Sequence, residues 1–487
     1  MNKFEIEYVI PDYVEKVARM LLKEGHQAYL VGGALRDIVM GVAPDDYDLA
    51  TDAKPEEMLK IFPKSVSVGV KFGMVIAQVP DRKGEIFDVE VMIFRSEEGY
   101  VSGRWPSKVT YVDSILEDLS RRDLTFNAMA LDLSTNSLDS SGKPKKWEII
   151  DPYNGARDIL KRVVRAVGNP LERFQEDGLR TMRACRIASE LQFNIEEETF
   201  SAIVEAIPVL KLVSIERVRD EFLKLLYRSP KPSYGIELLR KSGILEIYIP
   251  ELAECYGVEQ KKYHAHDVYW HSLKTCDLAP DRIKLAALFH DIAKPVKSTG
   301  DGHFYGHDVH GDKMVRDILK RLRFSRDEIE RVASLVKNHM FFYPYESEDM
   351  SDEEKEKIRE QEWSDSAVRR FIARVGEENL EDLFSLRIAD AASNPKTAFR
   401  RDEIEQLQRR ISEVQEKDNA FKISDLDING DDIIGGLGIS SGPIVGKILE
   451  YLFNIVLDDP LQNRKEILLD LAKDYVEKNS IQNVLSR

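Results

Sequence analysis

The spacing of apolar residues changes once along this chain, near residue 155. Before that point, apolar residues fall in short runs separated by turn residues, which is typical of strands. Beyond it, they recur every three or four residues nearly to the end, which is typical of packed helices. The predicted fold class is therefore α+β: a small α/β head with a mixed sheet, then an all-helical neck, body and tail. We expect a helix at 12–24 and strands at 28–31, 46–50, 73–79 and 86–94.

Composition excludes several classes of protein. Apolar residues make up 43% of the 487 residues, which is enough to build cores and excludes a mostly disordered chain. No apolar run approaches the roughly 20 residues that a membrane span needs, and the N-terminus lacks a signal-peptide core, so no membrane partner is expected. Cys185, Cys255 and Cys276 are too few and too dispersed for a disulfide framework, so a reducing, cytoplasmic location is expected.

The net charge of −16 argues superficially against a nucleic-acid partner. The acidic excess is uneven, however. Residues 346–365 hold ten acidic and three basic side chains, so this segment alone contributes −7. A local basic groove elsewhere in the chain is compatible with the composition.

A glycine pair precedes two acidic residues in the segment LVGGALRDIVMGVAPDDYDLATD (30–52). Asp46 and Asp48 are two positions apart on an expected strand, so both carboxylates should face the same side. Paired carboxylates repel each other unless a cation neutralises them, and their hard oxygen ligands suit Mg²⁺ bound together with substrate phosphates. Gly32 and Gly33 open a helix, where backbone N–H groups can approach a phosphate, although a plain tight turn explains them more simply.

A third carboxylate comes from the expected strand FDVEVMIF (87–94). Asp88, Glu90 and Met92 share one face of this strand, and the intervening apolar residues share the other. An acid pair on a polar strand face usually meets only solvent. Taken together with Asp46 and Asp48, however, Glu90 favours a site in which three carboxylates bind two metal ions.

Polar side chains also gather in EDLSRRDLTFNAMALD (117–132), beside an apolar strand. Arg121 and Arg122 are followed closely by Asp123 and Asn127. Arginine side chains bind phosphate oxygens with two parallel N–H groups, so this segment is a candidate phosphate contact. The alternative is a solvated turn.

Three motifs, VGGALRD, DDYDLAT and RRDLTFNAMA, in this order and spacing, resemble those of the class II nucleotidyltransferases. That family contains tRNA CCA-adding enzymes and bacterial poly(A) polymerases, and the similarity continues through residues 163–193 and 214–226. The resemblance implies that Asp46 and Asp48 bind catalytic Mg²⁺, that the RRD segment handles the sugar and triphosphate of the incoming nucleotide, and that the EDGLR segment reads its base. The nucleotide-binding residues would then be Gly33, Arg36, Arg122, Asp123, Asn127, Asp177, Arg180, Arg183 and Arg186.

The EDGLR segment also supports this role by its hydrogen-bonding capacity. Glu176, Asp177, Arg180 and Arg183 are expected to share one helix face, where an ion-pair ladder is the simpler interpretation. Adenine and cytosine present an exocyclic amine beside a ring-nitrogen acceptor, whereas guanine and uracil present a carbonyl beside a ring N–H. Asp177 can accept from the amine and Arg180 can donate to the ring nitrogen, so this pair would admit A and C and reject G and U.

Eight of the nine histidines lie between residues 264 and 339. A lone histidine on an apolar face is usually a satisfied core residue, but His290-Asp291 within an apolar segment needs partners if it is buried. Imidazole and carboxylate groups together bind divalent transition metals. The arrangement resembles an HD-type metal-dependent phosphohydrolase, and a degenerate HD fold that serves only as a tRNA-binding scaffold is the alternative. The ligand set that this resemblance implies is His271, His290, Asp291 and Asp390, with His307 and His339 as candidates for a second metal.

A subset of bacterial CCA-adding enzymes has this same order of parts. The resemblance implies a nucleotidyltransferase head over 1–140, a neck with the nucleotide-template helix over 141–228, an HD body over 229–400 and a tRNA-binding tail over 401–487. The expected function is addition of C, C and A to the 3′ end of tRNA from CTP and ATP, without a nucleic-acid template and by a two-metal mechanism. The HD domain is expected to be a phosphatase or 2′,3′-cyclic phosphodiesterase.

Three alternatives remain open. The chain could add only the terminal A, or it could be a poly(A) polymerase, although these enzymes generally lack the HD body. A different class is an HD phosphohydrolase whose head only binds RNA, but that function would require the loss of Asp46 or Asp48. Enzymes that add only CC shorten the flexible loop before the RRD motif, and residues 95–120 here correspond to the full-length loop.

Overall fold

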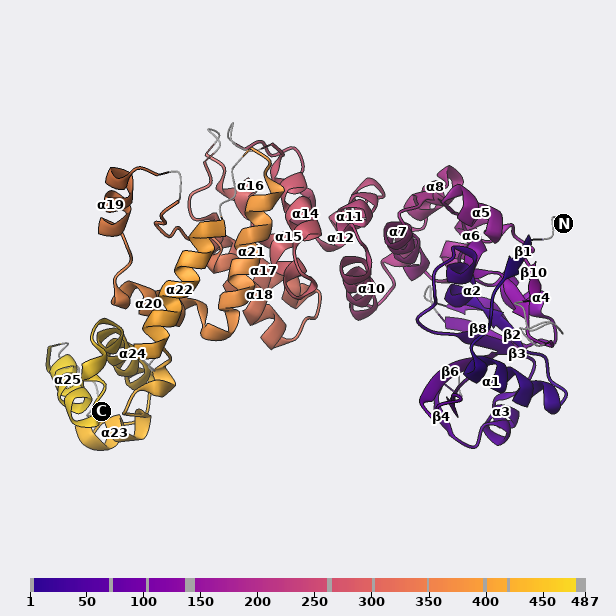
Figure 1. The fold of residues 1–487 in the computed structure, drawn as a ribbon, viewed down its shortest axis with the longest axis horizontal. Coiled ribbons are helices and arrows are strands. Elements are labelled where there is room, and N and C mark those ends of the chain that lie inside the picture. Colours follow the sequence, from indigo (N-terminus) through magenta and orange to yellow (C-terminus); the bar gives the residue numbers. More distant parts are fainter. Residues whose placement is uncertain are drawn as a thin grey trace. The chain divides into compact units, whose positions relative to one another are not determined.

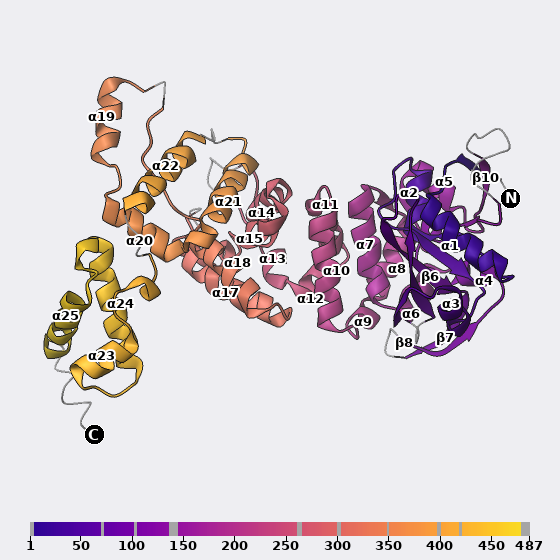
Figure 2. The same ribbon diagram turned by 60° about the horizontal axis from the view of Figure 1, so that its bottom comes forward.

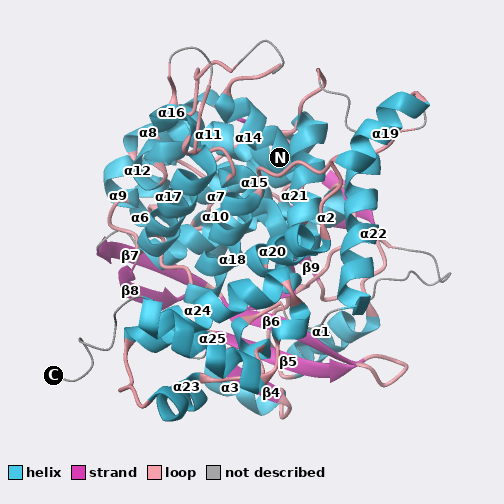
Figure 3. Cartoon of the chain, turned by 90° about the vertical axis from the view of Figure 1, so that its left-hand side faces the viewer, coloured by secondary structure: helices cyan, strands magenta, loops and turns pink. Residues whose placement is uncertain are grey.

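The computed structural model describes residues 4–69, 73–101, 105–135, 145–260, 265–299, 303–347, 350–396, 401–417 and 421–478. The chain forms two compact units, residues 1–250 and 251–487. Among the described residues, strands occur only in the first unit, and the second is built from helices. Figure 3 colours the helices cyan and the strands magenta. The predicted α+β class is confirmed.

An eight-stranded sheet forms the centre of the head, with the strand order β1-β10-β9-β2-β3-β6-β5-β4. The sheet is mixed, as predicted, because β3 pairs with β6 in parallel while the other neighbouring strands are antiparallel. Its strands are β1 (Phe4–Glu7), β2 (Tyr29–Val31), β3 (Asp48–Thr51), β4 (Ser65–Gly69), β5 (Met74–Pro80), β6 (Ile86–Ile93), β9 (Ala130–Asp132) and β10 (Lys146–Ile150).

One face of the sheet is covered by helices. The alternation of side chains along β6 and the apolar stripe of α1 (Asp12–Lys23) explain this packing. Val89 and Val91 of β6 are buried while Asp88 and Glu90 are exposed, as a strand with one covered face requires. The buried stripe of α1 packs against β5 and β6, and α3 (Pro55–Ile61) also packs against β5 (Figure 2). The helix expected at 12–24 is therefore confirmed to within one residue.

Residues 95–120, which correspond to the full-length flexible loop before the RRD motif, contain regular elements in their described part. They form a hairpin of β7 (Arg95–Val101) and β8 (Trp105–Tyr111), followed by α4 (Ile115–Ser120). Cross-strand backbone pairing therefore orders most of this segment.

Helices follow the sheet through the rest of the first unit (Figure 1). A short parallel pair, β11 (Val163–Val164) and β12 (Asn194–Ile195), lies among them. The remaining helices of this unit are α2 (Gly32–Val39), α5 (Gly155–Lys161), α6 (Pro170–Glu176), α7 (Leu179–Leu191), α8 (Glu197–Glu205), α9 (Ile207–Leu210), α10 (Ile215–Arg228), α11 (Pro232–Lys241) and α12 (Ile244–Tyr248).

In the described part of the second unit, all regular elements are helices. Its last three helices pack around an apolar core that includes Ile433, Ile448, Leu452 and Leu468. No described helix combines the length and the apolar composition that crossing a membrane requires. The helices are α13 (Pro250–Ala253), α14 (Val268–Leu278), α15 (Lys284–Phe289), α16 (Lys294–Lys297), α17 (His307–Arg321), α18 (Arg326–Asn338), α19 (Asp352–Glu360), α20 (Asp365–Val375), α21 (Leu380–Ser393), α22 (Arg401–Lys417), α23 (Gly430–Leu437), α24 (Pro443–Asp458) and α25 (Lys465–Lys478).

Candidate functional site

Three carboxylates meet where β3 begins. The parallel pairing of β3 and β6 sets Asp48 directly opposite Glu90. Burial first, and then the charges of Glu90 and Asp46, raise the pKa of Asp48 to about 7. The part of this rise in pKa that comes from Glu90 and Asp46 reflects repulsion between the negative charges, which a bound cation would relieve. The donor set is made only of oxygens, which suits Mg²⁺.

Asp46 does not lie on a strand, contrary to the prediction. β3 starts at Asp48, and Asp46 occupies a bend just before it. The alternation of strand faces therefore does not explain why the two carboxylates lie together. Both carboxylates nevertheless line the same cavity.

Gly32 allows the backbone to approach this carboxylate cluster. Its φ of +75° lies in the region that favours glycine, and a Cβ atom there would lie 3.3 Å from Oδ2 of Asp48 and 3.6 Å from Nη1 of Arg122. Gly33 has ordinary space, since an added Cβ would meet only the guanidinium of Arg36, at 3.7 Å. Of the two glycines, Gly32 is the one that the local geometry requires.

Asp118 holds both arginines of the RRD segment. Its Oδ1 accepts a hydrogen bond from Arg121 Nε at 3.1 Å, and its Oδ2 accepts one from Arg122 Nη2 at 3.1 Å. Burial would raise the pKa of Asp118, but the two guanidinium groups lower it below its usual value, so it stays ionised. The sequence analysis missed Asp118, although its spacing of three and four residues from the arginines on a helical turn is a recognisable signal.

Asp123 joins the RRD segment to α7. Its carboxylate accepts hydrogen bonds from Arg183 Nε at 2.9 Å, from Asn127 Nδ2 at 3.3 Å and from the backbone N–H of Leu124 at 2.9 Å. Burial alone would raise the pKa of Asp123, but Arg183 and Arg180 hold it well below its usual range. Asp123 and Arg183 are therefore a fixed ion pair at the wall of the site.

The EDGLR segment is not one continuous helix, so the prediction of a shared helix face is wrong. α6 ends at Glu176, Asp177 is extended with a φ of −141°, and α7 begins at Leu179. Next to the break, Gly178 packs against the backbone of Leu210, where an added Cβ atom would lie 2.6 Å from backbone atoms. This close approach requires a residue without a side chain at position 178.

Asp177 and Arg180 are each fixed by other groups at this break. Asp177 Oδ2 accepts from Arg217 Nη2 at 2.7 Å. Arg180 pairs with Glu176 and also donates to the backbone carbonyl of Arg121 at 3.0 Å. Both side chains are held in place before any ligand binds.

Two residues of α10 complete the site and were missed by the sequence analysis. Arg217 holds Asp177, and Glu221 is paired with Arg186, which also binds Glu190 at 2.7 Å. Arg217 and Glu221 are four residues apart, so they lie on one face of the helix. That spacing, inside a segment already similar to the family motifs, was the signal that could have revealed them.

One cavity of about 590 Å³ connects these groups. Nine of its lining side chains are basic and seven are acidic, so it has a local basic excess in an acidic chain. Glu90 does not line it but stands beside Asp48 in the sheet. The predicted residues that line it are Gly33, Arg36, Asp46, Asp48, Arg122, Asp123, Asn127, Asp177, Arg180, Arg183 and Arg186.

We expect Gly178→Ala to disturb this cavity. The added methyl group would overlap the backbone at Leu210, which costs about 1–3 kcal/mol and shifts Asp177 out of register. A lower unfolding temperature together with at least a tenfold loss of nucleotide transfer is the expected result. Gly33→Ala, where the space is ordinary, is the matched control for the unfolding temperature alone. An unfolding temperature and activity of Gly178→Ala equal to those of wild type would contradict this role of Gly178.

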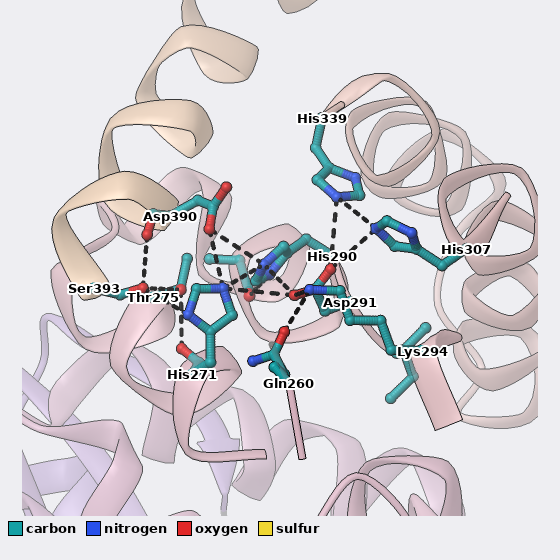
Figure 4. A network of polar contacts seen from close by, with 12 residues as sticks. Gln260, His271, Thr275, His290, Asp291, Lys294, His307, His339, Asp390 and Ser393 are labelled. Carbon is teal, nitrogen blue, oxygen red and sulfur yellow. Dashed lines mark hydrogen bonds and ion pairs between the residues drawn. The ribbon is translucent and has the colours of Figure 1, made fainter. Parts of the chain in front are cut away.

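A second cluster, in the other unit, consists of histidines and aspartates from several helices (Figure 4). His271, His290 and Asp291 form one buried group that could hold a metal ion. Nε2 of His290 lies 3.2 Å from both Nε2 of His271 and Oδ2 of Asp291. Oδ1 of Asp390 joins them at 3.0 Å from Nε2 of His271.

Asp291 also belongs to a second buried group, with His307 and His339. Its Oδ1 lies 3.2 Å from Nε2 of His307 and 3.7 Å from Nε2 of His339. The two carboxylate oxygens thus face different histidine pairs, which is the arrangement of a ligand shared by two metal ions. Of the other clustered histidines, His264 lies outside the described residues.

The hydrogen bonds of the histidine Nδ1 atoms, which face away from the cluster, fix the tautomer that metal binding requires. Nδ1 of His290 lies 2.8 Å from the carbonyl of Ala287, and Nδ1 of His339 lies 2.6 Å from that of Val336. His307 has the same contact with the carbonyl of Phe304, at 2.7 Å. A carbonyl can only accept, so Nδ1 carries the proton and Nε2 presents a lone pair to the cluster. These residues fit a divalent metal site.

Three known domain families match successive parts of this chain. Residues 28–165 match the Poly A polymerase head domain, residues 192–256 match the Probable RNA and SrmB- binding site of polymerase A, and residues 251–394 match the HD domain.

Curated proteins with similar sequences are CCA-adding enzymes. The CCA-adding enzyme of Geobacillus stearothermophilus is 30% identical over 450 residues, 92% of this chain and 93% of that enzyme. The CCA-adding enzyme of Enterococcus faecalis is 45% identical over 210 residues, 43% of this chain. That alignment, like the one with the Streptococcus mutans enzyme, spans about half the length of the relative.

The solved structures agree with the curated relatives. The Bacillus stearothermophilus CCA-adding enzyme in complex with CTP superposes with a TM-score of 0.65 at 26% identity, covering 96% of this chain and 98% of that one. Three findings agree on the family. They are the matches to the head, RNA-binding and HD domains, the relative aligned over nearly the whole chain, and the shared fold. The chain belongs to the family of CCA-adding enzymes.

Proposed function

We propose that this chain adds C, C and A to the 3′ end of tRNA, using CTP and ATP. The observation that carries the proposal is the single cavity in which the carboxylates Asp46 and Asp48 face the base-selecting pair Asp177 and Arg180. A relative of the same fold, 26% identical, was solved in complex with CTP, which supports the nucleotide assignment.

Each group has a distinct role in this proposal. Asp46 and Asp48, with Glu90 beside them, would hold Mg²⁺, which when bound activates the 3′ hydroxyl of tRNA and neutralises the pyrophosphate that leaves. Arg36 and Arg122 would bind the triphosphate.

Base selection would come from hydrogen-bond polarity. Asp177 would accept from the exocyclic amine of cytosine or adenine, and Arg180 would donate to the adjacent ring nitrogen. Because Arg217 and Glu176 hold these two side chains, they cannot rotate cheaply to accept a base of opposite polarity. A rigid site that would leave buried polar groups unpaired rejects the wrong base strongly.

Product length tests the proposal against its nearest alternatives. A tRNA transcript that lacks CCA, incubated with CTP and ATP, should gain three nucleotides and then stop. An A-only enzyme would extend that transcript only after CC had been supplied, and a poly(A) polymerase would produce a long, heterogeneous tail. Absence of any extension would contradict nucleotidyl transfer itself.

We expect Asp177→Ala to relax base selection. Without the acceptor, the amine of C or A gains no advantage over the carbonyl of U or G, and a lost hydrogen bond to a charged group corresponds to about a 10- to 100-fold loss of discrimination. The measurement is kcat/KM for CTP and UTP on the same transcript; Arg180→Ala should behave similarly. Unchanged CTP/UTP ratios in both variants, at measurable activity, would contradict the base-selecting role.

The HD body is proposed as a second, metal-dependent phosphohydrolase centre. The supporting observation is that all six candidate ligands, His271, His290, Asp291, His307, His339 and Asp390, converge in one cluster. Imidazole-rich sites favour transition metals such as Co²⁺ or Ni²⁺ over Mg²⁺. A retained site with a complete ligand set argues against a role as scaffold alone.

We retain the proposed division into head (1–140), neck (141–228), HD body (229–400) and tRNA-binding tail (401–487), which the order of the family matches supports. A cytoplasmic location is likewise proposed. Its support is that the three cysteines are free and buried, as in a reducing environment.

A further inference from the structure

The HD cluster is open on the side of α21. The side chains of His271, His290, Asp291, His307 and His339 are each less than 10% exposed. Asp390, which α21 contributes, is 19% exposed. Of these six side chains, Asp390 is therefore the one most exposed to solvent, on the side of α21.

Arg387 stands at this opening. It lies one helical turn before Asp390, is 26% exposed, and its Nη1 is 3.7 Å from Oδ2 of Asp390. Its other neighbours are Oε2 of Glu403, 3.8 Å from Nη2, and the ring of Phe341, 5.8 Å from the guanidinium carbon.

These contacts leave the hydrogen-bonding capacity of Arg387 unused. Both carboxylate distances exceed the range of a hydrogen bond, and the guanidinium donates none within the described part of the chain. Glu403 is itself engaged, because its Oε1 accepts from the backbone N–H of Tyr343 at 3.2 Å. Beyond these two long ion pairs, the N–H donors of Arg387 are available to an acceptor that arrives from solvent.

The other cation of the cluster cannot serve an incoming ligand in the same way. Lys294 lies 2.6 Å from Oδ2 of Asp291 and donates to Oε1 of Gln260 at 2.7 Å (Figure 4). Its side chain is only 10% exposed. Lys294 is therefore already bound to side chains inside the cluster, whereas Arg387 lies on its more exposed side.

We propose that Arg387 binds non-bridging oxygens of a phosphate ester held at the HD cluster. The planar guanidinium presents two parallel N–H donors, which match a phosphate better than a lysine ammonium does. This inference rests on the proposed phosphohydrolase function of the HD body, and it identifies the substrate as an anionic ester whose charged oxygens face α21.

Phosphate binding to the metal-loaded protein tests the inference without requiring turnover. The Co²⁺-loaded full-length protein is titrated calorimetrically with inorganic phosphate, for wild type, Arg387→Gln and Arg387→Lys. Arg387→Gln is expected to weaken phosphate binding about 10- to 100-fold, as for a lost hydrogen bond to a charged group, and Arg387→Lys to lie between. Bound cobalt per chain should be equal in all three proteins.

Arg316→Gln is the matched control, because Arg316 is paired with Asp312 and Glu330 on the surface of the same unit. Its phosphate affinity should equal that of wild type. Equal affinity in Arg387→Gln would overturn the inference, and so would wild-type protein that binds no phosphate. Loss of cobalt from Arg387→Gln would also overturn it, since Arg387 would then only position Asp390. If wild type binds phosphate but hydrolyses no ester, the proposed HD activity fails while the assignment of Arg387 stands.

Discussion

Replacing Asp48 by asparagine is expected to lower nucleotide addition about 10³-fold or more, because a metal ion contributes several kcal/mol to stabilising the transition state. Asparagine keeps the shape of the side chain but removes the charge that a metal requires. The measurement is single-turnover incorporation of CTP into a transcript lacking CCA. Binding of tRNA, measured separately, should remain largely intact.

The same variant should be more stable than wild type when no metal is bound. Burial and the neighbouring acids raise the pKa of Asp48 from 3.8 to about 7, so the folded state binds a proton more tightly than the unfolded state. The stability that this group contributes therefore falls as the pH rises between those values, and the charged form is unfavourable above pH 7. At pH 8 in EDTA, Asp48→Asn should unfold at a higher temperature than wild type.

Asp88→Asn provides the matched control for both measurements. Asp88 lies on the same face of β6 as Glu90, is exposed, and hydrogen-bonds to Gln78 rather than lining the cavity. Its substitution should leave addition unchanged. Normal incorporation by Asp48→Asn would show that the carboxylate cluster is not the catalytic centre.

Asp291→Asn is expected to remove the metal from the HD body and to abolish any phosphohydrolase activity. Asp291 is the residue shared by both ligand groups, so its loss affects both metal positions. Burial would raise its pKa, but His290 and Lys294 hold it well below the usual value, so asparagine removes a permanent charge. Metal content per chain and hydrolysis of a phosphate ester and of a 2′,3′-cyclic phosphate are measured with a panel of divalent metals.

CCA addition should survive in Asp291→Asn, because the two centres lie in different units and use different ligand types. Asp312→Asn, which removes a surface ion pair with Arg316, is the control for general effects on the helices. A folded Asp291→Asn protein that has lost CCA addition would contradict this independence. Wild-type protein that hydrolyses neither substrate with any metal would indicate a scaffold.

The sequence predicted features that depend on short local patterns, but it did not predict where helices and strands are interrupted. Strand alternation correctly placed Asp88 and Glu90 on one face, because covering one side of β6 enforces a period of two. The helix break at Asp177 lies beside Gly178, which packs against Leu210, a residue distant in sequence, and no local pattern reveals that contact. The position of Asp46 in a bend escaped prediction because the DDYDLA run has the alternation of a strand.

The sequence also did not reveal which polar side chains from distant helices contact the site residues. Arg217 holds Asp177 across forty residues of sequence, and Asp390 meets His271 only after α21 has packed against α14. Composition and periodicity predict that such helices are buried but not which polar side chains they bring together. Resemblance to the family motifs identified Asp390 because it carries information on tertiary contacts that periodicity lacks.

Selection of C twice and then of A by side chains of the protein, with no nucleic-acid template, is tested most directly with three tRNA transcripts. The transcripts end before the first C, after one C and after CC, and each of the four nucleotides is supplied separately. We expect incorporation of C on the first two transcripts and of A on the third, with UTP and GTP poor substrates throughout. Efficient use of UTP or GTP, or addition of A alone to all three transcripts, would contradict it.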